Sequence, residues 1–124
     1  MDKILLVGFG GFIGSSLRYW ISLSFYRILG QDFPYGTLAV NILGCLFIGL
    51  LMSLFEERFV FGPNMRIFLT VGVLGGFTTF SSFSYETIGL VREGSFYLGS
   101  LNVLLNVILC LGGTAIGGAV GKLI

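Results

Sequence analysis

The sequence has no histidine and few charged residues, which excludes most catalytic chemistry. Charged side chains make up 10% of its 124 residues, against roughly a quarter in an ordinary soluble domain. Acid–base and nucleophilic enzymes usually need a histidine, a carboxylate pair or a cysteine beside a base, and no apolar stretch here contains such a group. The net charge of +1 gives no indication of nucleic-acid binding. We therefore expect neither an enzyme nor a nucleic-acid-binding protein.

Two further chemistries are disfavoured by where the few reactive residues stand. Every acidic residue lies at the end of an apolar segment, whereas a proton-coupled transporter usually needs an acid inside the membrane. The two cysteines, Cys45 and Cys110, lie in separate apolar segments. We expect them to be small packed thiols and not a disulfide or a metal site.

What the sequence has instead is long apolar segments separated by clusters of charge. Residues 33–55 form a charge-free run of 23 residues, which as a helix spans about 35 Å and crosses a hydrocarbon core of about 30 Å. Residues 67–85 and 94–121 are also free of charge, whereas 4–26 is interrupted by Arg18. The prediction is an all-α integral membrane protein, a single domain over 1–124, with four transmembrane helices at about 4–29, 33–55, 66–92 and 94–122.

The third segment contains a sequence that a continuous transmembrane helix normally avoids. It reads Gly75-Gly76-Phe77-Thr78-Thr79-Phe80-Ser81-Ser82-Phe83-Ser84, which joins two glycines to five hydroxyl side chains. A broken backbone in lipid leaves costly unpaired N–H and C=O groups, so a break is tolerated only inside protein or beside water. We predict that the third helix is broken in mid-membrane near residues 75–79, at an ion or substrate site.

Lysine and arginine are divided almost evenly between the two ends of the predicted bundle. The side that holds the N-terminus carries Lys3, Arg58, Arg66 and Lys122. The other side carries Arg27 and Arg92, with Arg18 in the nearer half of the first helix. Because orientation follows this imbalance in short loops, two alternatives stay open. The chain has one orientation with both termini inside, or it inserts both ways and forms an antiparallel homodimer with room for a pore.

Polar side chains recur at helical spacing within the other segments. They are Arg18 in the first segment, Thr37 and Asn41 in the second, and Asn102, Asn106 and Cys110 in the fourth. Residues four apart share one face of a helix. Arg18 is either an interfacial anchor or a cation that concentrates anions at a vestibule. Asn41 either makes an interhelical hydrogen bond or donates to a passing anion. The stripe on the fourth segment is either glue between helices or, as we favour, the lining of a permeation path.

Aromatic and hydroxyl residues are mixed along the third segment. Phe80 and Phe83 are three residues apart, a spacing that usually indicates packing. A phenyl ring also has a positive edge, and such edges hold a small anion weakly enough for it to leave again. Thr79 and Ser81 add hydroxyl donors, and Glu86 at the end of the segment is expected to cap or anchor the broken helix.

Taken together, these residues resemble the Fluc/CrcB family of fluoride channels, and the resemblance covers essentially the whole chain. Three pieces occur in the family's order. They are Gly10-Gly11-x-x-Gly14-x-x-x-Arg18-Tyr19, Pro34-x-Gly36-Thr37-x-x-x-Asn41, and Gly75-Gly76-Phe77-Thr78-Thr79-Phe80-Ser81-Ser82-Phe83-Ser84-x-Glu86. The third piece is long and specific.

The resemblance implies an inverted, dual-topology homodimer that conducts fluoride passively out of a microbial cytoplasm. It implies that Phe80, Phe83 and Asn41 line the pore, that Thr79 and Ser81 lie near the ion path, and that Arg18 belongs to the vestibule. It also implies a structural sodium ion at the dimer centre, held by backbone carbonyls of Gly75 and Thr78 from both subunits. The resemblance also implies that the protein resides in a bacterial inner membrane.

The chain departs from the family pattern on its fourth segment. The family often has serine where this chain has Cys110, and the polar residues at Asn102 and Asn106 vary. A thiol is a poorer donor than a hydroxyl, which weakens the assignment of these three residues to the ion pathway. Two other functions stay open: a small proton-coupled multidrug or cation exporter of four helices, and an assembly protein that conducts no ions.

Overall fold

The computed structural model describes residues 2–58 and 61–124, and its regular structure there is entirely helical. The first two long helices are α1 (Asp2–Leu29) and α2 (Tyr35–Arg58). The third consists of α3 (Pro63–Ile67), the π-helical η1 (Phe68–Leu74), α4 (Gly75–Phe77) and α5 (Phe80–Arg92), and α6 (Phe96–Leu123) is the last.

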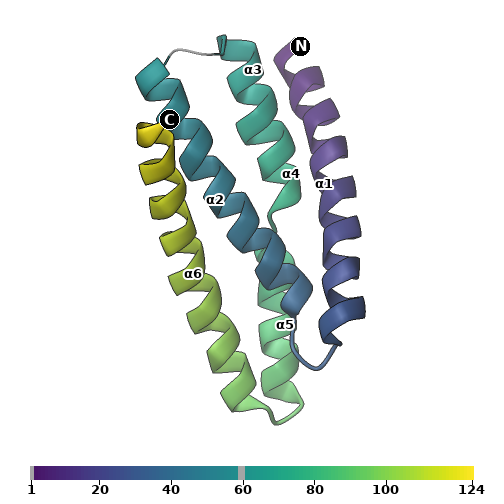
Figure 1. Ribbon diagram of the computed structural model, residues 1–124. Helices are drawn as coiled ribbons and strands as arrows, with labels where there is room; N and C mark the ends of the chain where they lie inside the picture. The colour runs from purple at the N-terminus through teal and green to yellow at the C-terminus, as the bar shows by residue number, and fades with distance from the viewer. Residues whose placement is uncertain (1, 59–60) are drawn as a thin grey trace.

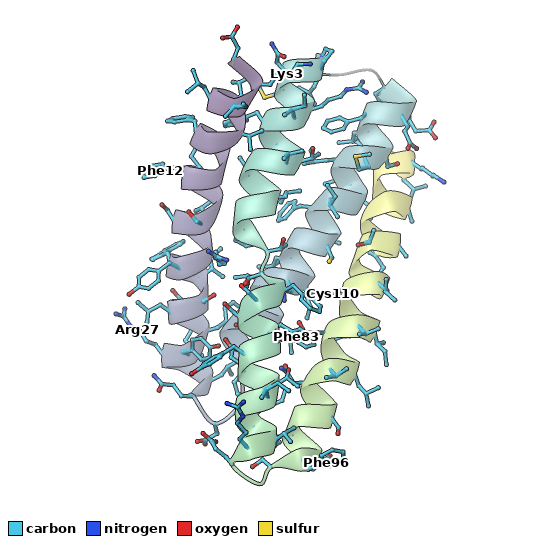
Figure 2. All side chains as sticks on the ribbon, turned by 180° about the vertical axis from the view of Figure 1, so that it is seen from behind. Lys3, Phe12, Arg27, Phe83, Phe96 and Cys110 are labelled. Atoms are coloured by element: carbon cyan, nitrogen blue, oxygen red, sulfur yellow. The ribbon has the colours of Figure 1, made fainter. Side chains whose placement is uncertain are left out.

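Four of these units are long and apolar enough to cross a membrane: Asp2–Leu29, Tyr35–Arg58, Pro63–Arg92 and Phe96–Leu123. The prediction of four membrane-spanning helices is confirmed, and the bounds differ from the expected ones by no more than three residues. Both marked termini lie at the same end of the bundle (Figure 1). Lys3 is at that end and Arg27 at the opposite one (Figure 2). Lysine and arginine are therefore present at both ends of the bundle.

Glycine allows the helices to approach each other closely. The most extensive packing joins α2 to α6, where a Cβ on Gly117 would collide with the Leu46 carbonyl oxygen and lie 2.9 Å from Leu50 N. On the other side of the bundle, α1 packs against η1 and α4. There a Cβ on Gly10 would lie 2.8 Å from the Phe68 carbonyl oxygen. No hydrophobic force drives helices together in lipid, so small residues at such crossings matter because they let the backbones approach closely enough for van der Waals packing.

The helix ends are set by local signals. The first helix stops before Gly30, whose φ of 91° only glycine adopts easily, and α5 stops before Gly94, whose φ is 88°. The C-terminal end of α2 is held by Arg66, which donates from Nη2 to the Phe55 carbonyl oxygen (3.1 Å) and from Nε to that of Phe61 (2.9 Å). The arginine thereby fastens the end of α2 to the start of the third membrane span.

Candidate functional site

Helical geometry is interrupted between α4 and α5. Thr78 has φ −85° and ψ 157°, and Thr79 has φ −149° and ψ 116°, so both are extended. Helix α5 begins again at Phe80 because Thr79 caps it: the Thr79 hydroxyl accepts a hydrogen bond from Ser82 N at 3.1 Å. The hydroxyl of Ser81 lies 3.2 Å from that of Thr79. Two hydroxyl groups, those of Thr79 and Ser81, therefore lie together at the start of α5.

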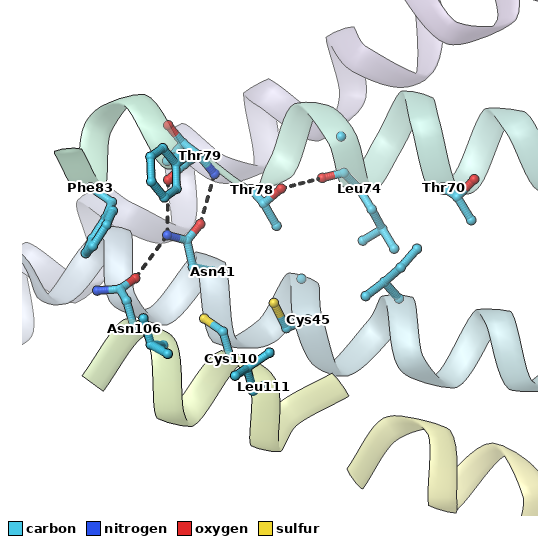
Figure 3. Close-up of a pocket in the computed structure, with 15 residues that line it drawn as sticks. Asn41, Cys45, Thr70, Leu74, Thr78, Thr79, Phe83, Asn106, Cys110 and Leu111 are labelled. Carbon is cyan, nitrogen blue, oxygen red and sulfur yellow. Dashed lines mark hydrogen bonds between the residues drawn. The ribbon is translucent and has the colours of Figure 1, made fainter. Parts of the chain in front are cut away.

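A side chain from α2 pairs with the extended backbone. Asn41 Oδ1 accepts from Thr79 N at 2.9 Å, and Asn41 Nδ2 donates to the Thr79 carbonyl oxygen at 3.1 Å (Figure 3). The amide of Asn41 thus pairs with Thr79 as a neighbouring peptide group would. Buried backbone groups need such partners, and Thr79 is buried. Asn41, on the neighbouring helix α2, therefore supplies hydrogen-bond partners for the N–H and C=O groups of Thr79 at the interruption.

At the interruption, two backbone carbonyls lose the donors that a continuous helix would give them. In a continuous α-helix, Thr79 N would bond to the carbonyl of Gly75 and Ser82 N to that of Thr78. Here Thr79 N donates to Asn41 and Ser82 N to the Thr79 hydroxyl. The carbonyls of Gly75 and Thr78 lose their regular helical donors, and both residues line the same pocket.

A directed series of hydrogen bonds connects α2, α6 and α5. Asn41 Nδ2 donates to Asn106 Oδ1 (3.1 Å), and Asn106 Nδ2 donates to Asn102 Oδ1 (3.0 Å). Asn102 Nδ2 then donates to the Thr87 hydroxyl (2.9 Å), which donates to the Phe83 carbonyl oxygen (2.7 Å). Asn102 is 0% exposed. Asn102 and Asn106 of α6 thus bond to neighbouring helices. Both N–H groups of the Asn41 side-chain amide are hydrogen-bonded within the chain.

Two phenylalanines form one wall of a pocket of about 490 Å³. The rings of Phe80 and Phe83 are 5.3 Å apart and inclined by 57°. Phe83 is 9% exposed and Phe80 is 78% exposed, so Phe80 stands on the outer surface of the single chain. None of the lining residues is charged: Asn41, Gly44, Cys45, Ile48, Thr70, Leu74, Gly75, Thr78, Thr79, Phe80, Phe83, Asn106, Val107, Cys110 and Leu111.

A second pocket, of about 930 Å³, is lined by charged residues of the α1–α2 and α5–α6 connections and by Glu86. Glu86 Oε1 accepts a hydrogen bond of 2.7 Å from the Thr37 hydroxyl, which lies 3.5 Å from that of Tyr26. The carboxylate therefore ties α5 to α2, as the expected anchoring role requires. Thr37 itself is buried and lines neither pocket.

Comparison with known proteins decides the family. The model of the family described as CrcB-like protein, Camphor Resistance (CrcB), matches residues 5–118. The chain belongs to the CrcB family. It is 46% identical over its whole length to a protein of Clostridium novyi, covering 99% of that protein. It is 50% identical to one of Clostridium perfringens, over 86% of each chain, and 44% identical to one of Geotalea daltonii over the full length of both. Each of the three is named fluoride-specific ion channel FluC.

The family resemblance seen in the sequence is thereby confirmed, and this CrcB chain is a multi-pass membrane protein. The structure gathers most of the residues that the sequence singled out into one pocket: Asn41, Gly75, Thr78, Thr79, Phe80, Phe83, Asn106 and Cys110. Ser81 adjoins that pocket through its contact with Thr79. Arg18 is half-buried on α1, and Arg18 and Asn102 line neither pocket.

Sequence reasoning missed several residues of the pocket in this CrcB chain. Thr70 and Leu74 line it from η1, and Cys45 lines it from α2. Short π-helical turns are frequent at functional sites, but residues 68–74, which form η1, contain no sequence signal that distinguishes them from an ordinary apolar helix. Cys45 stands four residues after Asn41, on the same face of α2, and that spacing is a signal that could have found it.

Proposed function

We propose that this chain is a fluoride-selective ion channel that lets fluoride leave the cytoplasm passively. The observation that carries the proposal is the uncharged pocket at the start of α5, where two phenyl rings meet hydroxyl and amide groups. Three relatives at 44–50% identity are named fluoride-specific channels. A proton-coupled exporter would need an acid in such a pocket, and its lining contains none.

The chemistry of the wall suits a small, strongly hydrated anion. The edge of a phenyl ring carries partial positive charge, and the hydroxyls of Thr79 and Ser81 supply O–H donors in place of water. A fixed cation in the path would bind fluoride too tightly for conduction. We assign Phe80 and Phe83 to direct contact with the ion. Asn41 has a positioning role, since its hydrogen bonds hold the extended backbone of Thr79 in place.

We further propose that two copies of the chain assemble in opposite orientations, with the third helix of each broken at membrane depth. In one chain alone, Phe80 and Ser81 are exposed beside the polar pocket lining. Lipid offers no hydrogen-bond partner to the hydroxyl of Ser81, and a second copy would cover both residues. The near-even division of lysine and arginine supports insertion in both orientations.

The carbonyls of Gly75 and Thr78 fit the proposed sodium site at the centre of this dimer. Both have lost their regular helical donors, and carbonyl oxygens are suitable ligands for an alkali cation. Each chain supplies two such oxygens, so two chains around an axis would supply four. A cation bound there would join the two interrupted helices by its charge.

The function is tested by anion efflux from proteoliposomes that contain the purified protein, with fluoride and chloride measured in parallel. Rapid loss of fluoride with retention of chloride is the expected result. Loss of both anions would refute selectivity. Retention of fluoride by vesicles that contain a verified folded dimer would refute the channel proposal, and flux that depends on an imposed pH gradient would favour the exporter.

The inverted assembly is tested by forcing a single orientation. Asn64→Lys with Met65→Lys strengthens the positive charge of the end that holds both termini. Gln31→Lys and Asp32→Lys, combined with Lys3→Gln and Lys122→Gln, reverse the imbalance. Each variant alone is expected to lose most fluoride efflux, and coexpression of the two should restore it. Full activity from either variant alone, with labelling that shows one orientation, would contradict an antiparallel dimer.

A further inference from the structure

The two cysteines lie together, although they come from helices far apart in the sequence. Cys45 belongs to α2 and Cys110 to α6, both are free, and both line the pocket. Their side chains are direct neighbours in the contact between the helices (Figure 3). The sequence expectation of two separate packed thiols did not include this juxtaposition.

Backbone packing brings α6 close to α2 beside Cys45. A Cβ built on Gly113, three residues after Cys110, would lie 3.8 Å from the Cys45 Cβ and 3.3 Å from the Ile42 carbonyl oxygen. The absence of a side chain at Gly113 therefore lets α6 lie directly on this turn of α2. Because cysteine has a short side chain, this close approach of the helices is what lets the two thiols lie together.

The composition of the pocket selects the kind of ion that two thiols can bind. Sulfur ligands favour soft cations, and the pocket lining has no carboxylate and no imidazole to complete a four-ligand set. A divalent cation M²⁺ that replaces two thiol protons gives a neutral complex, M²⁺ + 2 RSH → M(SR)₂ + 2 H⁺. Neutrality matters here because an uncompensated charge is costly in an apolar environment.

We propose that Cys45 and Cys110 form a two-sulfur site for a soft divalent cation such as Hg²⁺, and that its occupancy blocks the ion path. The blocking part rests on the proposed channel function. Cys110 stands four residues from Asn106, and both line the pocket that Phe80 and Phe83 also line. An ion held by the two sulfurs takes up space beside the rings and alters the field that an anion meets there.

Binding is tested with HgCl₂ on the purified full-length protein, without reference to transport. Retained mercury is measured while glutathione competes for it. Two-point attachment typically strengthens binding by about 10²–10⁴-fold over one point. We therefore expect Cys45→Ser and Cys110→Ser each to release mercury at glutathione concentrations at least about 100-fold lower than the wild type does. Thr70→Ser, which alters the same pocket but leaves both thiols, should retain it as the wild type does.

Retention in either single variant equal to that of the wild type would overturn the shared site, because the thiols would then bind independently. In proteoliposomes, Hg²⁺ should stop fluoride efflux through the wild type and leave efflux through the double Cys45→Ser/Cys110→Ser variant unchanged. A two-thiol site that binds mercury without slowing efflux would overturn the block. If wild-type vesicles show no fluoride efflux before mercury is added, the channel proposal is refuted instead. The two-sulfur site is then still tested by the retention assay.

Discussion

Replacing Gly117 by alanine tests whether backbone contact between α2 and α6 holds the fold together. The added Cβ would meet the Leu46 carbonyl oxygen and lie 2.9 Å from Leu50 N and 3.0 Å from the Leu46 carbonyl carbon. All three are backbone atoms, which cannot move aside as a side chain can. Overpacking of this kind costs about 1–3 kcal/mol, so we expect the two helices to be forced apart.

A matched control on the same helix isolates that cost. A Cβ on Gly112 would meet nothing within 4 Å. Alanine is about 1 kcal/mol more favourable than glycine in a helix interior, and this gain is common to both variants. It cancels in their difference. The free energy of unfolding of Gly117→Ala should therefore be about 1–3 kcal/mol lower than that of Gly112→Ala.

The assay is equilibrium unfolding in mixed micelles, followed by circular dichroism at increasing mole fractions of a denaturing detergent. Gly8→Ala on α1, where a Cβ also meets nothing within 4 Å, is a second control for the general effect of the exchange. Equal stability of Gly117→Ala and Gly112→Ala would refute the reasoning, because the collision would then cost nothing.

Two further predictions concern the pocket. Phe80→Ile keeps apolar bulk but removes the positive ring edge, and Phe80 is largely exposed on one chain. Fluoride efflux should fall at least about tenfold, which corresponds to a barrier about 1.4 kcal/mol higher, while the size-exclusion elution volume stays that of the wild type. Asn41→Asp keeps the shape but turns both Nδ2 donations, to the Thr79 carbonyl and Asn106 Oδ1, into contacts between oxygens. Two buried acceptors without donors cost about 1–3 kcal/mol each, and detergent unfolding should show the loss.

Each of these variants has a control that separates its cause. Phe96→Ile removes an exposed ring at the start of α6, outside both pockets, and should leave efflux unchanged. If Phe80→Ile also conducts normally, that ring is not part of the mechanism. Asn64→Asp makes the same exchange at an exposed position and should hardly alter stability. An Asn41→Asp variant as stable as Asn64→Asp would show that the pairing with Thr79 does not hold the extended backbone.

Much of the fold could be predicted because the membrane imposes simple rules. A span needs about 20 apolar residues, and charge clusters in this sequence mark where each one ends. Which glycines let helices meet is shown by the structure: Gly10 lies against the backbone at Phe68, and Gly117 against the backbone at Leu46. The short π-helical segment Phe68–Leu74 could not be read from composition. The structure places this segment against α1, where Gly10 and Gly72 lie in contact.

The site was only partly visible in the sequence. Helical spacing predicted that Asn102, Asn106 and Cys110 share a face of one helix, but spacing does not say what that face meets. The structure turns Asn102 toward Thr87 of α5, and Asn106 toward Asn41 of α2. Hydrogen bonds between helices are set by crossing positions and rotations. No local pattern records these, so the sequence could not show that Asn102 and Asn106 bond to other helices while Asn106 and Cys110 also line the pocket.

The sequence by itself determined that this protein lies in a membrane, how many times it crosses the membrane and to which family it belongs, because these follow from local composition and from long motifs. Only the tertiary structure decided that Asn41 pairs with the backbone of Thr79, which deprives the carbonyl of Gly75 of its helical donor. It alone brought Cys45 beside Cys110. Both outcomes depend on helices separated in sequence crossing where glycine allows backbones to meet, and such contacts form only when the whole bundle packs.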